Sequence, residues 1–360
     1  MKLTGVIKVI FQTKKFINPT GDEMKEIHRK ISELLKKEYK IEIKKIKEIE
    51  DGQNLNYVMD GFKTNENINI RLFLKVISKD GYPDVETLNR AYELLKSKGF
   101  QYYNIIYHDT SSEIAPYGFI VQEWIDGEVR VSNSDCYIEE GKCLGEDEEI
   151  PWLRDYAGVL KKIHSIKLDH FGDIKGDVKF YNIHEYYDNI DEVIRWSFGN
   201  VKHGGIMLND LVEHEILDGE FLRYVLEKVS DLGRNIGSKQ SMLIYGDMFP
   251  SNIIYKGNEP RIIDWDECRA NWWVYEIART TYYIENRDFA MKFIEYYIPE
   301  ESIEEIDIGI RIEHVKQHLR KLCITCMNRD KNQQLMENIE NFKDKIIDRL
   351  ENRFLWEKNN

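Results

Sequence analysis

The apolar residues of this chain follow two different periods along its length. Between residues 21 and 40 they recur every three or four positions, the spacing of one helix face. Between residues 41 and 77 they gather in runs rich in β-branched and aromatic side chains, which are typical of strands. Beyond residue 150 the helical period returns and prevails. The pattern predicts an α+β fold, with a small β-rich N-terminal part and a larger, mainly helical C-terminal part.

The same patterns place the individual elements. The predicted strands are 41–49, 56–61, 68–77, 102–107 and 118–124. The predicted helices are 21–40, 84–98, 151–163, 181–200, 208–235, 283–298 and 303–355. A Thr20-Gly21-Asp22 start is a plausible cap for the first of these helices.

The stretch from Leu243 to Trp265 has the most informative order of residues. Two apolar runs flank a polar loop that holds Asp247 and Asn252, and a third apolar run ends on Asp264. Turn-forming residues at 256–260 separate the second and third runs, which predicts a hairpin. Such a hairpin would bring Asn252 and Asp264 to the same end, with Asp247 just before them.

Two carboxylates and an amide in one cluster of loops are hard oxygen ligands, which suit a magnesium–nucleotide site. The order Asp-x-x-x-x-Asn, then a strand, then Asp is the layout of kinase active sites. The alternative is that Asp247 belongs to an ordinary turn and Asp264 to an ordinary strand end. The fixed order of strand, loop, hairpin and final carboxylate favours the functional interpretation.

This stretch resembles the aminoglycoside phosphotransferase and choline kinase superfamily, whose signature is His-Gly-Asp-x-x-x-x-Asn followed by Ile-Asp-Trp/Phe. Tyr245 stands where the family has its His, a structural residue there. The resemblance implies a bilobal protein-kinase-like fold, with a nucleotide-binding lobe over residues 1–126 and a catalytic and substrate-binding lobe over residues 127–360. It also implies transfer of the γ-phosphoryl group of ATP or GTP to a hydroxyl group of a small molecule. Asp247 would take the hydroxyl proton, and Asn252 and Asp264 would hold Mg²⁺.

The resemblance extends to the first lobe. Lys75, within Leu-Lys-Val, would bind the nucleotide phosphates behind a glycine loop that contains Gly52 and Asn56. Read alone, that loop is an ordinary hairpin and Lys75 a solvated side chain.

Glu86 is the predicted partner of Lys75, with Glu93 as a second candidate and a solvated glutamate as the alternative. The backbone of Glu123 and Ile125 would contact the adenine at the hinge between the lobes.

The charge of the chain bears on its partners. A net charge of −13 argues against a nucleic-acid or anionic-membrane partner and is compatible with a cationic substrate. Asp266 and Glu267 directly follow the metal ligand, and they are the predicted contacts to the acceptor. With Glu276, Glu285 and Asp288 they would favour a polycationic acceptor such as an aminoglycoside, which would make antibiotic resistance the biological role. The alternative is that these acids form a solvated surface.

The cysteines indicate the compartment. Five cysteines, an odd number scattered over 360 residues, suit a reducing cytoplasm. Lys8 and Gln12 interrupt the first apolar segment, so no signal peptide is expected, and no run has the length of a membrane span. A metal site at Cys323 and Cys326, near two histidines, is less favoured than a buried helix face.

Two other functions stay open at this point. Asp264-Trp-Asp266 also matches the Asp-x-Asp of glycosyltransferases, although that interpretation leaves Lys75 and Asp247 without a role. The superfamily also contains non-catalytic kinase-like proteins of the spore-coat type, and kinases for choline-like or sugar substrates.

Overall fold

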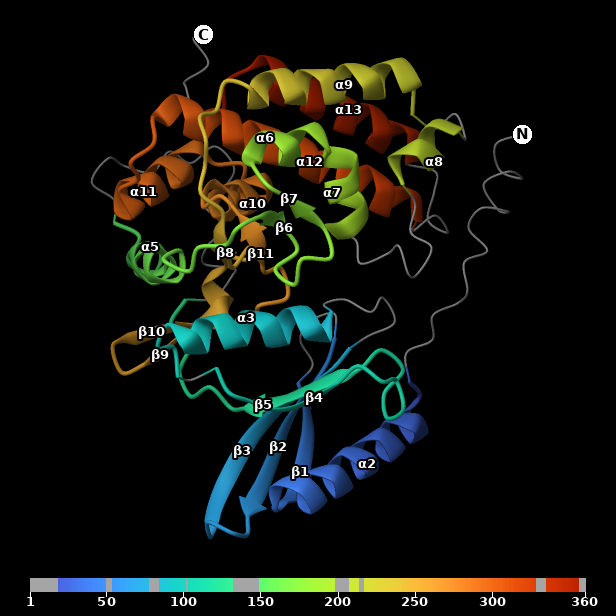
Figure 1. Cartoon of the computed structure of the whole chain (residues 1–360), viewed down its shortest axis with the longest axis vertical. Coiled ribbons are helices and arrows are strands. Elements are labelled where there is room, and N and C mark those ends of the chain that lie inside the picture. The colour runs from blue at the N-terminus through green and yellow to red at the C-terminus, as the bar shows by residue number, and fades with distance from the viewer. Residues whose placement is uncertain are drawn as a thin grey trace. The chain divides into compact units, whose positions relative to one another are not determined.

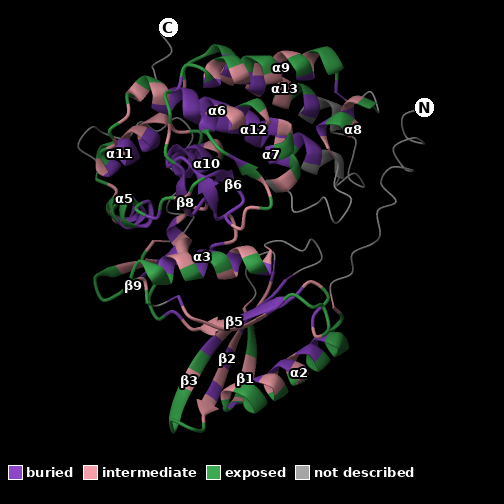
Figure 2. Ribbon diagram, viewed as in Figure 1, coloured by how far each residue is buried: buried purple, intermediate pink, exposed green. Residues whose placement is uncertain are grey.

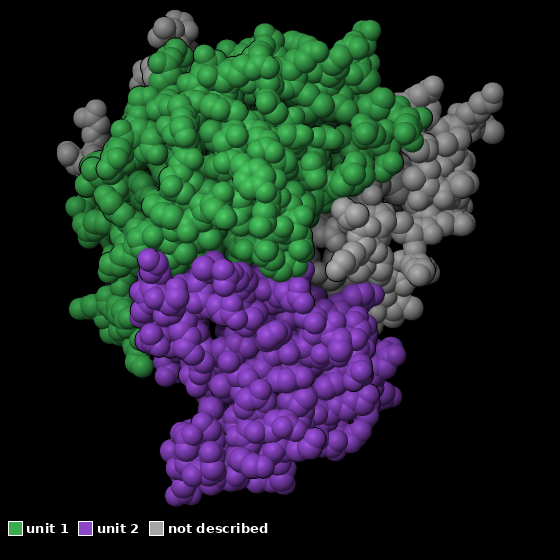
Figure 3. All heavy atoms as spheres, in the orientation of Figure 1, with its two compact units in different colours: residues 1–13, 127–360 green, residues 14–126 purple. Residues whose placement is uncertain are grey.

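The computed structural model describes residues 19–49, 54–77, 84–101, 103–131, 149–197, 207–213, 217–327 and 335–355 (Figure 1). These residues form two compact units, divided between Asp126 and Gly127 (Figure 3). The N-terminal unit holds a five-stranded sheet, and helices prevail in the C-terminal unit. The predicted α+β, kinase-like class is confirmed.

The N-terminal unit begins with α2 (Gly21–Tyr39), which is capped as its sequence predicts. The Thr20 hydroxyl accepts the Glu23 N–H, and the Glu23 carboxylate accepts the Thr20 N–H at 2.6 Å. This reciprocal pair satisfies two backbone donors that the first turn of a helix leaves unpaired. The apolar face of α2, formed by Met24, Ile27, Ile31 and Leu35, packs on the sheet.

The sheet of this unit is antiparallel, in the order β1-β2-β3-β5-β4. Its strands are β1 (Ile41–Ile49), β2 (Leu55–Lys63), β3 (Ile68–Val76), β4 (Ile105–Asp109) and β5 (Phe119–Glu123). Along β3, Leu72, Leu74 and Val76 belong to the core that contains α2. Because side chains alternate along a strand, Lys75 faces the other side of the sheet. Helix α3 (Val85–Ser97) lies across the sheet from α2 (Figure 1).

The C-terminal unit is built mainly from helices. Those that the structure describes are α5 (Pro151–Ile163), α6 (Ile183–Asp188), α7 (Ile190–Ser197), α8 (Leu208–Glu213), α9 (Gly219–Gly233), α10 (Val274–Ile284), α11 (Arg287–Tyr297), α12 (Ile303–Met327) and α13 (Leu335–Glu351). Helix α10 is at the centre of this unit and is buried over most of its length (Figure 2).

Three segments predicted as single long helices each contain two of the described helices, and residues 214–216 and 328–334 within them lie outside the described part of the chain. The segment 181–200 contains α6 and α7, which meet at Asn189, and 208–235 contains α8 and α9. The Asp218 carboxylate caps α9 by accepting the Glu220 N–H at 2.9 Å. The segment 303–355 contains α12 and α13. The spacing of apolar residues does not reveal where a capping residue starts a new helix.

The described residues of the C-terminal unit also form two small sheets. One has the order β7-β6-β11-β8, from β6 (Phe171–Gly172), β7 (Lys179–Phe180), β8 (Met242–Ile244) and β11 (Arg269–Asn271). The other is the hairpin of β9 (Ile253–Lys256) and β10 (Glu259–Ile262). In the part of the chain that the structure describes, no helix combines the length with the apolar character that crossing a membrane requires.

Candidate active site

The hairpin β9–β10 sets the spacing of the predicted metal ligands. Its last strand pair is Ile253 with Ile262, and the Ile263 N–H then donates to the Asn252 carbonyl at 2.9 Å. Asn252 therefore lies opposite the residue that precedes Asp264. The turn has two residues, and the first of them, Gly257, has a positive φ of 60°. The hairpin thus brings Asn252 and the start of the Asp264 loop together, as its sequence predicts.

Asp247 lies in the loop between β8 and the hairpin, and Asn252 holds it from the far end of that loop. The Asn252 Nδ2 donates to Asp247 Oδ2 at 2.8 Å and to its carbonyl oxygen at 3.1 Å. Burial raises the pKa of the Asp247 carboxyl to about 7, against the opposing effect of Arg279. A carboxylate with a pKa near neutrality is well matched to accepting a proton at physiological pH.

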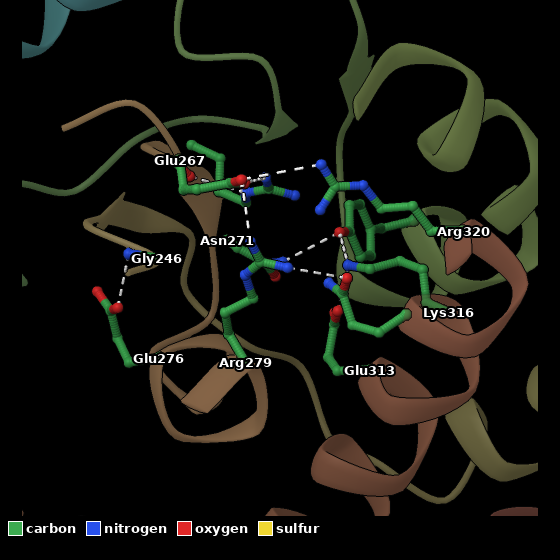
Figure 4. A network of polar contacts seen from close by, with 11 residues as sticks. Gly246, Glu267, Asn271, Glu276, Arg279, Glu313, Lys316 and Arg320 are labelled. Atoms are coloured by element: carbon green, nitrogen blue, oxygen red, sulfur yellow. Dashed lines mark hydrogen bonds and ion pairs between the residues drawn. The ribbon is translucent and has the colours of Figure 1, made fainter. Parts of the chain in front are cut away.

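The backbone just before Asp247 is held by a carboxylate from α10. The N–H groups of Tyr245 and Gly246 donate to Glu276 at 2.6 and 2.7 Å. Glu276 is fully buried, and its side chain reaches Gly246 from below in Figure 4. Gly246 has a φ of 83°, and a Cβ added there would lie 2.7 Å from the Glu267 carbonyl oxygen. Glycine is needed both for the backbone conformation and for this close approach.

Tyr245, which stands in place of the family's His, links the two loops of the site. Its ring is fully buried and makes an edge contact with Trp265, at 5.2 Å between ring centroids. Its hydroxyl donates to the carbonyl oxygen of Ile263 at 2.8 Å. The residue two positions before Asp247 is therefore bonded to the residue directly before Asp264.

Asp264 has surroundings unlike those of Asp247. Its side chain is exposed, and its φ of 62° is left-handed, a conformation that non-glycine residues other than Asn and Asp rarely adopt. Trp265, the next residue, is fully buried and anchors the loop. The exposed Asp264 side chain thus lies between two anchored residues, Ile263, whose carbonyl is bonded to Tyr245, and the buried Trp265.

The side-chain oxygens of Asn252 and Asp264 fit a magnesium ion whose other ligands would be nucleotide phosphates and water. Because the Asn252 amide nitrogen is directed to Asp247, its amide oxygen is the end that can coordinate a cation. Mg²⁺ is usually bound by one or two carboxylates together with phosphates and water. The described residues contain no group of three histidine, cysteine or acidic side chains able to hold a metal ion.

Glu267 lies within a cluster of three arginines, two of which, Arg279 and Arg320, are labelled in Figure 4. Its carboxylate bonds Arg269 Nη2 at 3.1 Å and Arg279 Nη2 at 3.0 Å, and it lies 3.8 Å from Arg320 Nη2. The prediction that Glu267 contacts the acceptor stays a prediction, as does that for the half-buried Asp266.

Most of the acids predicted to surround the acceptor have partners. Glu276 is bound to the Asp247 loop, Glu285 pairs with Lys345 at 2.7 Å, and Asp288 lies 3.8 Å from Arg287. Glu285 and Asp288 therefore lie beside cations, and the Glu276 carboxylate is directed to backbone N–H groups. The role of these acids toward a polycationic acceptor stays a prediction.

The three arginines around Glu267 are functional candidates that sequence reasoning missed. One signal was available: Arg269 follows Glu267 by two positions, the spacing of neighbours on one face of an extended chain.

In the N-terminal unit, Lys75 is buried on β3. Asn56 of β2 and Ile120 of β5 are its direct neighbours across the sheet. Glu86 is exposed and lies in the first turn of α3. Gly52 falls outside the described residues. The roles assigned to Lys75, Asn56, Glu86 and Gly52 stay predictions.

At the predicted hinge, the backbone is only partly available to a nucleotide. The Glu123 N–H donates to the Asn104 carbonyl at 2.9 Å, so an adenine would have to use the Glu123 carbonyl oxygen. Ile125 is buried. The predicted adenine contacts of both residues stay predictions.

On α12, Cys323 is buried, as the buried-face interpretation predicts, and the side chain of Cys326 lies outside the described residues. His314 contacts the Thr281 hydroxyl at 3.1 Å and the Ala278 carbonyl at 3.0 Å.

Comparisons with known proteins bear on the family and the fold of this chain. The sequence profile of the phosphotransferase enzyme family matches residues 46–303. No curated protein sequence matches the chain.

Solved structures of three kinds share its fold. A thermostable mutant of the aminoglycoside phosphotransferase APH(4)-Ia has a TM-score of 0.54 at 10% identity, covering 89% of this chain and 98% of its own. The choline kinase LicA from Streptococcus pneumoniae has a TM-score of 0.53 at 15% identity, covering 90% and 98%. An ethanolamine kinase of Plasmodium vivax has a TM-score of 0.54 at 14% identity, covering 85% and 81%. The resemblance stated from the sequence is confirmed.

Proposed function

This chain belongs to the phosphotransferase enzyme family, and from that premise we propose that it transfers the γ-phosphoryl group of ATP or GTP to a hydroxyl group of a small molecule. The observation that carries the proposal is the hairpin register, which brings Asn252 and the Asp264 loop together while Asn252 also holds Asp247. Phosphoryl transfer needs little covalent chemistry from the protein, so fixed positions and charges supply most of the catalysis.

In this proposal, Asp247 takes the proton of the acceptor hydroxyl as the oxygen attacks. Asn252 and Asp264 hold Mg²⁺, which neutralises phosphate charge when bound. Lys75 binds the phosphates. Glu86 as the partner of Lys75, Gly52 and Asn56 in the phosphate loop, and the backbone of Glu123 and Ile125 at the adenine complete the predicted nucleotide site.

For the acceptor we propose a small hydroxyl compound, with aminoglycosides and choline-like amines as the first compounds to test. The solved structures with this fold include an aminoglycoside phosphotransferase, a choline kinase and an ethanolamine kinase. Asp266 is the proposed contact to a cationic acceptor.

The test is nucleotide consumption with a panel of aminoglycosides, choline, ethanolamine and neutral sugars, with and without Mg²⁺. The expected result is magnesium-dependent turnover with one class of acceptor, and a product whose mass increases by one phosphoryl group. The matched control is Asp247→Asn, which keeps the shape of the side chain and removes the proton acceptor. Magnesium-dependent ATP binding without turnover of any acceptor would favour a non-catalytic, spore-coat-type role. Absence of nucleotide binding would contradict the proposal.

A further inference from the structure

The contacts of Glu267 reach the backbone that carries the proposed catalytic base. The Glu267 carbonyl oxygen lies so close to Gly246 that any side chain at position 246 would meet it. Gly246 immediately precedes Asp247, and Glu267 follows Asp264 by three residues in a loop anchored by Trp265. The two loops therefore pack backbone to backbone at one contact between Gly246 and Glu267.

The Glu267 side chain connects this contact to the rest of the unit. Arg269 lies on β11, Arg279 on α10 and Arg320 on α12, so the guanidinium groups come from three separate elements. The Arg269 Nε also donates to the Glu267 carbonyl oxygen at 3.2 Å. In Figure 4, Arg279 and Arg320 point toward Glu267 from their two helices.

The charges in this cluster depend on one another. Arg269 and Arg279 have side chains only 3% and 7% exposed, so solvent screens their positive charges poorly. Glu267 is the carboxylate that all three arginines share. Removing one partner of a buried ion pair is strongly destabilising, because the remaining charge is left in a medium of low polarity.

We propose that Glu267 is a positioning residue, the shared counter-ion of Arg269, Arg279 and Arg320 that fixes the Asp264 loop against the Asp247 loop. The expected effect on kcat rests on the proposed function. The expected effect on the two loops rests on the contacts alone. It gives Glu267 a role other than acceptor binding, because both carboxylate oxygens face arginines and the side chain is 12% exposed.

The structural test is hydrogen exchange in three variants. Glu267→Gln should raise the exchange rates of backbone amides in segments 245–248 and 264–268 by about tenfold, since these loops open without full unfolding. Asp307→Asn is the matched control, because Asp307 is also a carboxylate paired with a buried arginine, Arg311, on α12, and its side chain is 2% exposed against 12% for Glu267. In that control the two segments should exchange as in the wild type.

The double variant Glu267→Gln with Arg279→Gln tests the counter-ion role directly. Removing one of the stranded positive charges should return part of the protection that the single variant loses, which is a coupling between the two positions. Wild-type exchange in both segments of Glu267→Gln would overturn the proposal, as would equal loosening in Asp307→Asn.

Kinetics separate positioning from acceptor binding. Once the wild type turns over an acceptor, Glu267→Gln should lower kcat by about tenfold or more with little change in the acceptor KM, because the reacting groups are misaligned. A rise in KM with an unchanged kcat would assign Glu267 to the acceptor instead. If the wild type phosphorylates no acceptor, the proposed function fails, and hydrogen exchange still decides the structural part.

Discussion

The loop that carries Asp247 and the loop that carries Asp264 place the same functional group in opposite surroundings. Asp247 is half-buried, accepts a hydrogen bond from Asn252, and has a pKa raised to about 7. Asp264 is exposed, on a left-handed residue beside a buried tryptophan. The Asp247 carboxylate accepts a hydrogen bond from Asn252, and the Asp264 backbone adopts a left-handed conformation next to the buried Trp265.

The difference follows from the two proposed tasks. A proton acceptor works best when its pKa lies near the working pH, and burial provides that shift. A magnesium ligand must stay ionised and reach an ion that also carries water and phosphates. The same side chain therefore suits two roles because its environment differs.

The largest expected effect is at Asp264. Asp264→Asn keeps a residue that tolerates the left-handed conformation and removes the negative charge, so it isolates the charge from backbone strain. We expect kcat/KM to fall by more than about 10³-fold, because the metal contributes several kcal/mol to transition-state stabilisation. Magnesium titration of activity is the measurement. Asp264→Ala should be worse still, and activity within tenfold of wild type in either variant would contradict the metal role.

Asp247→Asn should lower kcat by about 10²–10⁴-fold, the usual contribution of a positioned general base. Nucleotide binding should be kept, because the phosphates and the metal are assigned to other residues. Parallel calorimetry of nucleotide binding and steady-state kinetics would separate the two effects. Turnover at the wild-type rate would show that Asp247 is not the base.

The pH profile sharpens the contrast between the loops. Because the Asp247 pKa is raised to about 7, the carboxylate is protonated below that pH and cannot accept a proton. We expect kcat/KM to fall about tenfold per pH unit below pH 7 and to level off above it. Asp247→Asn should lose this acidic limb, and a flat wild-type profile between pH 5 and pH 8 would contradict the assignment.

Asn252→Ala should have a smaller effect, about tenfold on magnesium affinity, because water can replace a neutral ligand. It should also raise the pKa of Asp247, and so move the acidic limb of the pH profile to higher pH, since the lost hydrogen bond favoured the ionised form of Asp247. Magnesium titration and a pH profile of this variant test both effects. A loss equal to that of Asp264→Asn would reverse the proposed ranking.

The smallest expected effect is on stability. A carboxyl whose pKa is raised on folding favours the folded state when it is protonated, so ionised Asp247 costs stability above the pKa of the unfolded chain, near 4. Asp247→Asn removes that cost and should raise Tm at pH 8 by about 2–4 °C, with little change at pH 4. Thermal unfolding of both proteins at the two pH values is the measurement. An equal rise at both pH values would point to another cause.

Local signals in the sequence predicted much of the fold and the core of the candidate site. The capping box at Thr20 and the turn at Gly257 each depend on residues a few positions apart, and both elements form as expected. The relation between Asn252 and Asp264 was predictable for the same reason, because a short hairpin determines it.

The surroundings of Glu267 were not predictable in this way. From the sequence, Glu267 and Asp266 were predicted to lie near an acceptor. The order of charged residues along the chain does not reveal which arginine on a distant helix contacts which acid. Arg279 comes from α10 and Arg320 from α12, and only the packing of these helices brings them to Glu267. Fully buried Glu276 illustrates the same limit. The sequence alone does not distinguish a glutamate on an exposed helix face from one that is buried and bonded to a loop.

The hairpin β9–β10 also determines which changes of chain length the site can absorb. Lys256 pairs with Glu259 next to the turn, and Ile253 with Ile262 next to the site. Adding one residue to each arm lengthens the hairpin at the turn and keeps Asn252 opposite Ile263. Adding one residue to a single arm shifts the register and turns every following side chain to the opposite face. Insertions compatible with the site should therefore come in matched pairs or as bulges near the turn, so hairpin length can vary among related chains while the spacing at its base stays constant.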